Sequence, residues 1–161
     1  MKASVYGLLA LGAVVLAAGD AAAGEVSVKR GEQVSITSGC HDCHTAGYNE
    51  TGGKIDPAAA LKGTPLAWQG PWGTTYAANL RLIAKDKGSE DGFVQYLKTF
   101  QARPPMPSFN VHAMDESDMR SLYQYIVSLG EPGEAMPDFV PPGQEPKTPY
   151  IVIAPPIMPK G

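Results

Sequence analysis

The 161-residue chain has little cysteine and little histidine, with two and three residues respectively. Its 16 acidic residues outnumber its 13 basic residues, so the net charge is −3 and the positive field that nucleic-acid binding needs is missing. No segment after residue 23 holds the ~20 consecutive apolar residues that span a bilayer. The composition therefore argues against nucleic-acid partners and predicts a soluble mature protein.

Both cysteines fall in one five-residue motif, Cys40-His41-Asp42-Cys43-His44. The pattern C-x-x-C-H is the attachment signal of a c-type haem. Two thiols three positions apart can form thioethers with both vinyl groups of one haem, and the adjacent His44 can reach the iron as the proximal ligand. We therefore predict one covalently attached haem c, bound by Cys40, Cys43 and His44, with His44 on the metal.

Two other uses of the motif stay open. A redox-active C-x-x-C pair should lie in a βαβ pattern, which the flanking residues do not show. A structural zinc site needs four Cys or His ligands, and only His112 lies outside the motif. Both interpretations are weaker than covalent haem.

The N-terminus predicts export. Lys2 provides a positive start, Val5 to Ala18 form an apolar run, and Ala21-Ala22-Ala23 offer a small-residue cleavage site. This is the pattern of a secretory signal peptide, here residues 1–23, cleaved near Ala23. A membrane anchor is the alternative, but the run is shorter than a bilayer requires. Export to the periplasm fits the motif, because haem is attached to C-x-x-C-H on the outer side of the bacterial cytoplasmic membrane.

The remaining residues are enough for one domain. We predict a haem domain over 24–130 and a proline-rich tail over 131–161. The only charged residues of the signal segment are Lys2 and Asp20, so the net charge stays at −3 after cleavage. A partner is therefore expected to offer a basic or mixed docking face.

Apolar periodicity predicts short helices around the motif. A helix over 28–38 would deliver the motif, although Val34 to Thr37 also alternate as a strand would. Phe93 and Leu97 lie at helical spacing and are expected in the core. We predict a loop over 48–71 and further helices over 74–85, over 92–100 with Ser89 as N-cap, and over 115–129 with Asp115 as cap.

The prolines set the character of two further segments. Residues 103–109 cannot be helical, because their prolines remove amide donors and fix φ. The tail can form neither a helix nor a central strand. A disordered tail is one reading. Because Tyr150 to Ile153 are apolar and would gain by packing, we expect an extended tail that is partly attached through them and adds little to the core.

Met106 is the strongest candidate for a sixth ligand to the iron. Pro105 and Pro107 stiffen its loop, which precedes the last predicted helix and could close over the haem face opposite His44. Met114 and His112 are the alternatives, and an open sixth position is a further one. Met119 lies on the apolar stripe of the last helix and is expected in the core.

The motif at the end of a first helix, a Met-Pro loop and an acid-opened last helix resemble a class I cytochrome c. The run from Gly70 to Leu80 resembles a segment in cytochrome subunits of membrane-associated alcohol and gluconate dehydrogenases, and so does Pro105-Met106-Pro107 followed by residues 114–119. The resemblance covers about residues 30–130. It implies a small all-α bundle around one haem, with the first and last helices crossing, and it suggests Trp72 and Arg103 as partners of the haem propionates.

The function expected from these features is single-electron transfer between redox proteins through a His/Met-ligated haem, without catalytic residues. The partners would be a dehydrogenase, an oxidase or another cytochrome. One alternative is a haem-bearing subunit of a larger periplasmic oxidoreductase, docked to a membrane complex through the tail. Another is a haem enzyme or gas-binding protein with an open sixth position.

Overall fold

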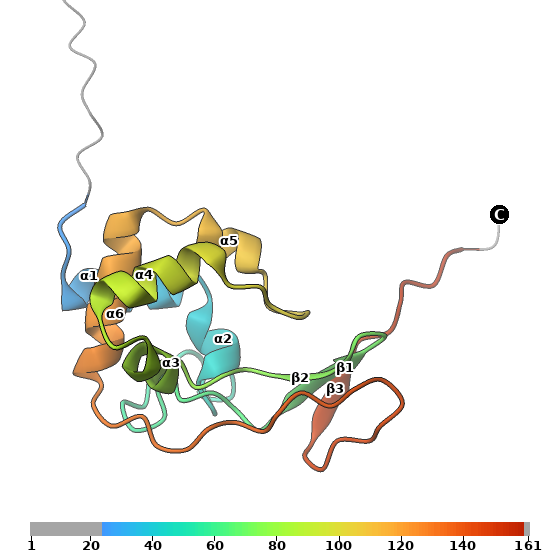
Figure 1. Ribbon diagram of the computed structural model, residues 1–161. Coiled ribbons are helices and arrows are strands. Elements are labelled where there is room, and N and C mark those ends of the chain that lie inside the picture. Colours follow the sequence, from blue (N-terminus) through green and yellow to red (C-terminus); the bar gives the residue numbers. More distant parts are fainter. Residues whose placement is uncertain (1–23, 160–161) are drawn as a thin grey trace, which may run out of the picture.

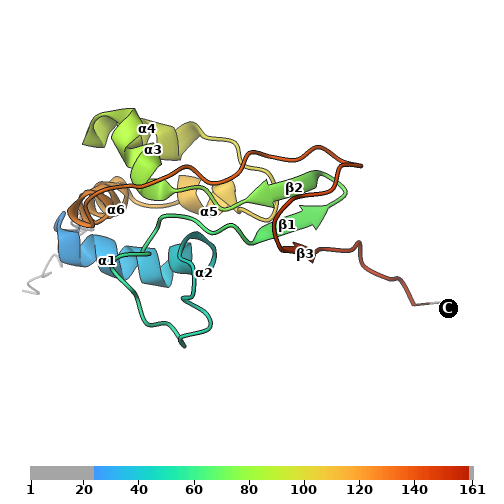
Figure 2. The ribbon, with the colours of Figure 1, turned by 90° about the horizontal axis from the view of Figure 1, so that it is seen from below.

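The computed structural model describes residues 24–159, so the predicted signal peptide and its cleavage site lie outside the described residues. Helices gather at one end of the molecule, and a small three-stranded sheet projects at the other (Figures 1 and 2). None of the helices in this part of the chain combines the length and apolar character needed to cross a membrane. The helices are α1 (Val28–Thr37), α2 (Cys40–His44), α3 (Leu80–Lys87), α4 (Glu90–Thr99), α5 (Ser108–His112) and α6 (Glu116–Ser128), and the strands are β1 (Ala67–Gly70), β2 (Gly73–Tyr76) and β3 (Tyr150–Val152).

The first and last helices of the domain cross in close contact. Gly31 of α1 is buried against α6, where a Cβ atom would collide with the backbone carbonyl of Ser121. Beside this crossing the Arg30 guanidinium donates to both carboxylate oxygens of Asp118, at 2.7 and 2.8 Å. The α1–α6 crossing is the expected one, and it depends on a glycine where the helices touch.

A single apolar cluster fills the space between α1, α3, α4 and α6. Phe93, Leu97 and Met119 are buried in it, as predicted. Burial of such side chains stabilises the domain by about 1.5–3 kcal/mol each. The buried members are Val34, Leu61, Ala84, Phe93, Val94, Leu97, Met119, Leu122, Tyr125 and Ile126.

The helices predicted before the motif, after Ser89 and after Asp115 are confirmed. Residues 28–37 are helical, so the strand alternative for Val34 to Thr37 is wrong. Ser89 caps α4, and its side chain accepts from the Gly92 N–H at 3.1 Å. Asp115 stands at the N-cap of α6 as expected, but its side chain makes no capping hydrogen bond.

Three predictions about the remaining elements are corrected. The helix predicted over 74–85 begins only at Leu80, because residues 73–76 pair with β1 as an antiparallel hairpin. The end of the loop predicted over 48–71 is strand β1, so the domain is mostly helical but not all-α. The segment predicted to be non-helical over 103–109 is so only as far as Pro107. No proline follows in that segment, and helix α5 begins at Ser108.

The C-terminal segment lies along the domain and then joins the sheet. Val140 exchanges two backbone hydrogen bonds with Thr74, at 2.8 and 3.0 Å. Tyr150–Val152 then pairs with β1 in parallel as an edge strand, and the Ile153 N–H donates to the Gln69 carbonyl at 2.7 Å. The attachment is at the expected residues, but it is made by backbone pairing and not by apolar packing, because the side chains of Tyr150–Val152 stay exposed. Within residues 131–159 there is no helix.

Candidate functional site

The C-x-x-C-H motif forms its own short helix, α2, directly after α1. Gly39, between the two helices, has a left-handed backbone with φ of 68°, and a Cβ atom there would lie 3.1 Å from Oδ2 of Asp42. Only glycine adopts this conformation at little cost, so it permits the sharp turn. The turn leaves Cys40, Cys43 and His44 together on one short helix.

His44 is held by two hydrogen bonds from neighbouring segments. Its ring Nδ1–H donates to the Ala78 carbonyl at 2.7 Å, and its own carbonyl accepts from the Gly63 N–H at 2.8 Å. Burial lowers the pKa of the ring, and the Ala78 carbonyl raises it by less. The imidazole is therefore neutral at pH 7, with its proton on Nδ1 and a lone pair on Nε2. No group within residues 24–159 hydrogen-bonds to that Nε2 atom.

This donor set fits a covalent haem c. Histidines that bind metals donate their other ring N–H to a carbonyl or carboxylate, which is what His44 does. Two thiols and this imidazole on one helix are the groups that thioether attachment and axial ligation require. Among the described residues, no three His, Cys, Asp or Glu side chains are grouped to hold a metal ion by themselves, so the zinc interpretation has no geometric support.

The environment of the two cysteines does not favour thiol redox chemistry. Burial raises the pKa of the Cys40 thiol to about 11, and it also raises the pKa of the Cys43 thiol. Both thiols are therefore protonated at neutral pH. Thiol–disulfide exchange proceeds through the thiolate, which reactive cysteines favour by a lowered pKa.

His41, inside the motif, is a buried structural residue that the sequence analysis did not identify. The Ser35 hydroxyl donates to the Glu32 carbonyl at 2.7 Å, so it accepts the Nε2–H of His41 at 3.0 Å. The Nδ1 atom of His41 then accepts from the Thr45 hydroxyl at 2.8 Å, and that oxygen accepts from the Leu61 N–H. This chain of bonds fixes α2 against α1 and the following loop. Nothing in the residue pattern distinguishes His41 from an exposed residue at one of the two variable positions of the C-x-x-C-H motif.

The three candidates for a sixth ligand lie in different surroundings. Met106 is half-buried in the loop between α4 and α5, where its N–H donates to the Arg103 carbonyl at 3.2 Å. Met114 packs against the core cluster. The Nε2–H of His112 donates to the Phe100 carbonyl at 3.0 Å. Of the three, Met106 is the side chain that neither the core packing nor a hydrogen bond engages in the described structure.

Trp72 and Arg103, the predicted propionate partners, lie in separate places. The Trp72 Nε1–H donates to the Thr75 hydroxyl at 3.1 Å within the β1–β2 hairpin. The Arg103 guanidinium stacks on Phe139, 3.9 Å from the ring centroid. Arg103 also lines a cavity of about 310 Å³ together with Ala78, whose carbonyl orients His44, whereas Trp72 is not among the residues around that cavity. Their contact with haem stays a prediction.

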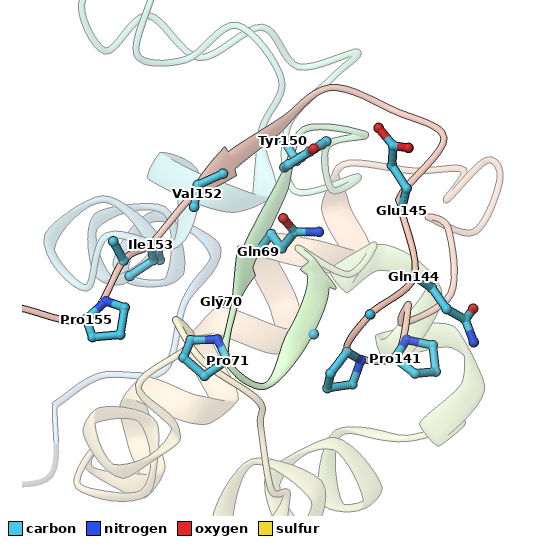
Figure 3. A pocket seen from close by; sticks show the side chains of 14 residues that line it. Gln69, Gly70, Pro71, Pro141, Gln144, Glu145, Tyr150, Val152, Ile153 and Pro155 are labelled. Carbon is cyan, nitrogen blue, oxygen red and sulfur yellow. The ribbon is translucent and has the colours of Figure 1, made fainter.

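A second, larger pocket lies elsewhere, between the sheet and the C-terminal segment (Figure 3). It measures about 620 Å³ and is lined mainly by glycines and prolines of residues 69–73 and 141–155, with Gln69, Gln144 and Glu145 as its charged or amide side chains. None of the motif residues borders it. Its size therefore does not identify the functional site.

A protein-family model for cytochrome c matches residues 28–130, which is more than half of the chain. The match begins at the first residue of α1 and ends two residues after α6. It includes the motif helix, the Ala78 carbonyl and the Met106 loop. No curated protein and no solved structure matches the chain.

Proposed function

Because the chain belongs to the cytochrome c family, whose members attach haem c covalently and transfer electrons, we propose that it is an exported carrier of single electrons with His44 and Met106 as axial ligands. The observation that supports this most is the state of His44. Its Nδ1–H is committed to Ala78, and its Nε2 lone pair projects from the helix that bears both cysteines. The haem, when bound, supplies the reversible one-electron chemistry.

The residues of the chain bind, orient and shield that group. Cys40 and Cys43 form the thioether links, and His44 provides an axial nitrogen whose orientation is fixed by Ala78. The hydrogen bonds of His41 connect the attachment helix to α1 and to Thr45, which follows the motif. No proton transfer is needed, because the imidazole keeps its Nδ1 proton throughout.

Met106 is proposed as the second axial ligand because of its setting. Turn hydrogen bonds on both sides of Met106 restrict the conformation of its loop. The Met106 N–H donates to the Arg103 carbonyl at 3.2 Å, and the Ser108 N–H donates to the Met106 carbonyl at 3.0 Å. Ordering such a loop costs little further entropy. A thioether is a soft ligand that favours Fe(II), which suits a protein that accepts an electron and passes it on.

A second candidate function is a haem-bearing subunit of a larger oxidoreductase. The observation that favours it is the apolar end of the chain: Ile151 and Val152 are 47% and 64% exposed, and Ile157 is 95% exposed. Exposed apolar side chains mark an interaction site where they form one contiguous patch, which a partner seated on this end of the chain would cover. The molar mass of the purified exported protein, alone and with membrane extract, separates a free carrier from a subunit.

The test of the proposed function is extraction followed by spectroscopy. Acid–acetone treatment should leave the red colour on the polypeptide, and replacing Cys40 or Cys43 by serine should weaken attachment. The ferric protein should show the weak long-wavelength charge-transfer band of thioether ligation, absent in Met106→Ala and retained in Met114→Ala. Haem that moves into the solvent would refute covalent attachment, and a high-spin wild type that binds carbon monoxide freely would refute the His/Met carrier.

A further inference from the structure

The Ala78 partner of His44 is fixed by residues outside the family match. We call residues 131–140, which run from the end of α6 to β2, the C-terminal strap (Figure 2). Asn79 is buried beside Ala78, and its Nδ2 atom donates to the Pro132 carbonyl at 2.7 Å and to the Glu134 carbonyl at 2.9 Å. The peptide that accepts the Nδ1–H of His44 is therefore adjacent in the chain to a residue that two hydrogen bonds connect to the strap.

The other partner of His44, Gly63, is also covered by the strap. A Cβ atom at Gly63 would lie 2.5 Å from Cγ of Met136 and 2.5 Å from the Ala77 carbonyl oxygen. Gly63 itself has a φ of +83°, which favours glycine, so the close approach and the backbone conformation both require this residue. Met136 thus packs over Gly63, whose N–H donates to the His44 carbonyl.

The strap is anchored by hydrogen bonds at both ends. At its start the buried Arg81 guanidinium donates to the Leu129 and Glu131 carbonyls, at 2.7 and 3.4 Å. At its end Val140 forms two backbone hydrogen bonds with Thr74. Between these anchors the strap accepts the hydrogen bonds of Asn79, which is adjacent to Ala78, and its own Met136 lies against Gly63.

We propose that the C-terminal strap, acting through Asn79 and Met136, holds the hydrogen-bond partners of His44 in place and so sets the basicity of the axial imidazole. This inference rests on His44 being the axial ligand of the proposed function. A firmly held carbonyl acceptor increases electron donation from an imidazole to its metal. Loosening the strap should weaken that donation, which favours Fe(II) and raises the reduction potential. Asn79 and Met136 are positioning residues, because they act through Ala78 and Gly63.

The experiment measures hydrogen exchange of the His44 Nδ1–H proton by NMR in the ferrous haem-loaded protein, together with its reduction potential. Asn79→Ser removes the two donors to the strap but retains a side-chain oxygen that can cap α3, as Asn79 Oδ1 now does by accepting from the Leu82 N–H. Met136→Ala loosens the other contact without touching Asn79. Each variant should exchange this proton on the order of tenfold faster than wild type and have a higher potential.

The matched control is Thr148→Val, which breaks the hydrogen bond of the C-terminal segment to the Tyr76 hydroxyl, outside the strap. It should keep the wild-type exchange rate and potential. If Asn79→Ser and Met136→Ala also keep both, or if the control changes as much as they do, the positioning role is wrong while the proposed carrier stands. If wild-type His44 shows no signal shifted by a bound haem, the proposed function fails, and this inference fails with it.

Discussion

The helical domain and the C-terminal segment of this cytochrome c are held in place by different interactions. In the domain, apolar side chains of α1, α3, α4 and α6 form one buried cluster, and no residue of 131–159 belongs to that cluster. The segment is held mainly by hydrogen bonds to and from backbone groups, such as those of Asn79, Arg81 and Val140, with a few side-chain contacts such as Arg103 on Phe139. Burial of apolar area thus determines where the domain ends, while directional bonds determine where the added segment lies.

The largest effect should come from a change in the helix crossing of the domain. Gly31→Ala places a methyl group against the Ser121 backbone, which cannot move without shifting α6. Overpacking at a rigid contact of this kind should destabilise the protein by about 3 kcal/mol, measured by urea unfolding. Gly24→Ala is the control, because a Cβ atom there meets nothing within 4 Å. Equal stability of the two variants would contradict the close α1–α6 contact.

A smaller loss is expected at the boundary between the two regions. The Arg81 guanidinium, 4% exposed, donates to the carbonyls of Ala60 and Pro57 in the loop and of Leu129 at the end of α6. Arg81→Met fills similar space but leaves these carbonyls without their donor, which should cost about 2 kcal/mol in the free energy of unfolding. Arg81→Lys should lose part of this, because one ammonium cannot reach all the acceptors. If Arg81→Met has the same free energy of unfolding as wild type, water must replace the guanidinium as the donor to these carbonyls.

The difference between the regions also explains which elements could be predicted from sequence. The helices at 90–99 and 116–128 bury one apolar face, and the spacing of their apolar residues predicts it. The helix at 28–37 buries Gly31, Val34 and Ser35, so only Val34 marks its inner face in the sequence. The hairpin at 67–76 was missed because its four-residue strands are too short for a clear alternation. Its second strand is followed directly by the helical spacing of α3, so the sequence pattern extends the helix back to residue 74. Pairing with β1 makes residues 73–76 a strand instead.

The candidate site divides in the same way. Cys40, Cys43 and His44 are recognisable because their chemistry depends on side chains at fixed spacing. The Ala78 carbonyl and the Gly63 N–H are backbone groups, so no residue type marks them, and only the fold brings them to His44. The burial of His41 likewise depends on how α2 turns back against α1, which the motif itself does not specify.

Removal of the whole C-terminal segment should have a smaller effect than either substitution. Truncation after Gly130 deletes no member of the core cluster, and the bonds it removes were partly offset by the entropy lost in ordering the segment. The shortened protein should fold, incorporate haem and lose about 1 kcal/mol of stability, measured by thermal unfolding monitored at the haem absorption. Failure to incorporate haem would show that the segment belongs to the folding unit.

The smallest effect concerns a surface contact within the domain. Hydrogen bonds from Lys98 and Arg120, both at 2.6 Å, lower the pKa of the Glu116 carboxyl to about 2 and connect α4 to α6. Because this folded-state pKa lies below the unfolded value of about 4.3, the ion pairs stabilise the fold fully above that value. Their contribution is lost as the pH falls toward about 2. Glu116→Gln should therefore be less stable than wild type at neutral pH, and the gap should close between about pH 5 and pH 2.

Denaturant unfolding at a series of pH values, in low and in high salt, measures this gap. Exposed charges are screened by salt, so the gap at neutral pH should also shrink in high salt. The same gap should appear in the protein truncated after Gly130, because the groups that bond to Glu116 lie on α4 and α6 and not in the C-terminal segment. If truncation removes the pH-dependent gap, the two regions are coupled through α6, and the separation between a domain held by its core and a segment held by backbone bonds is wrong.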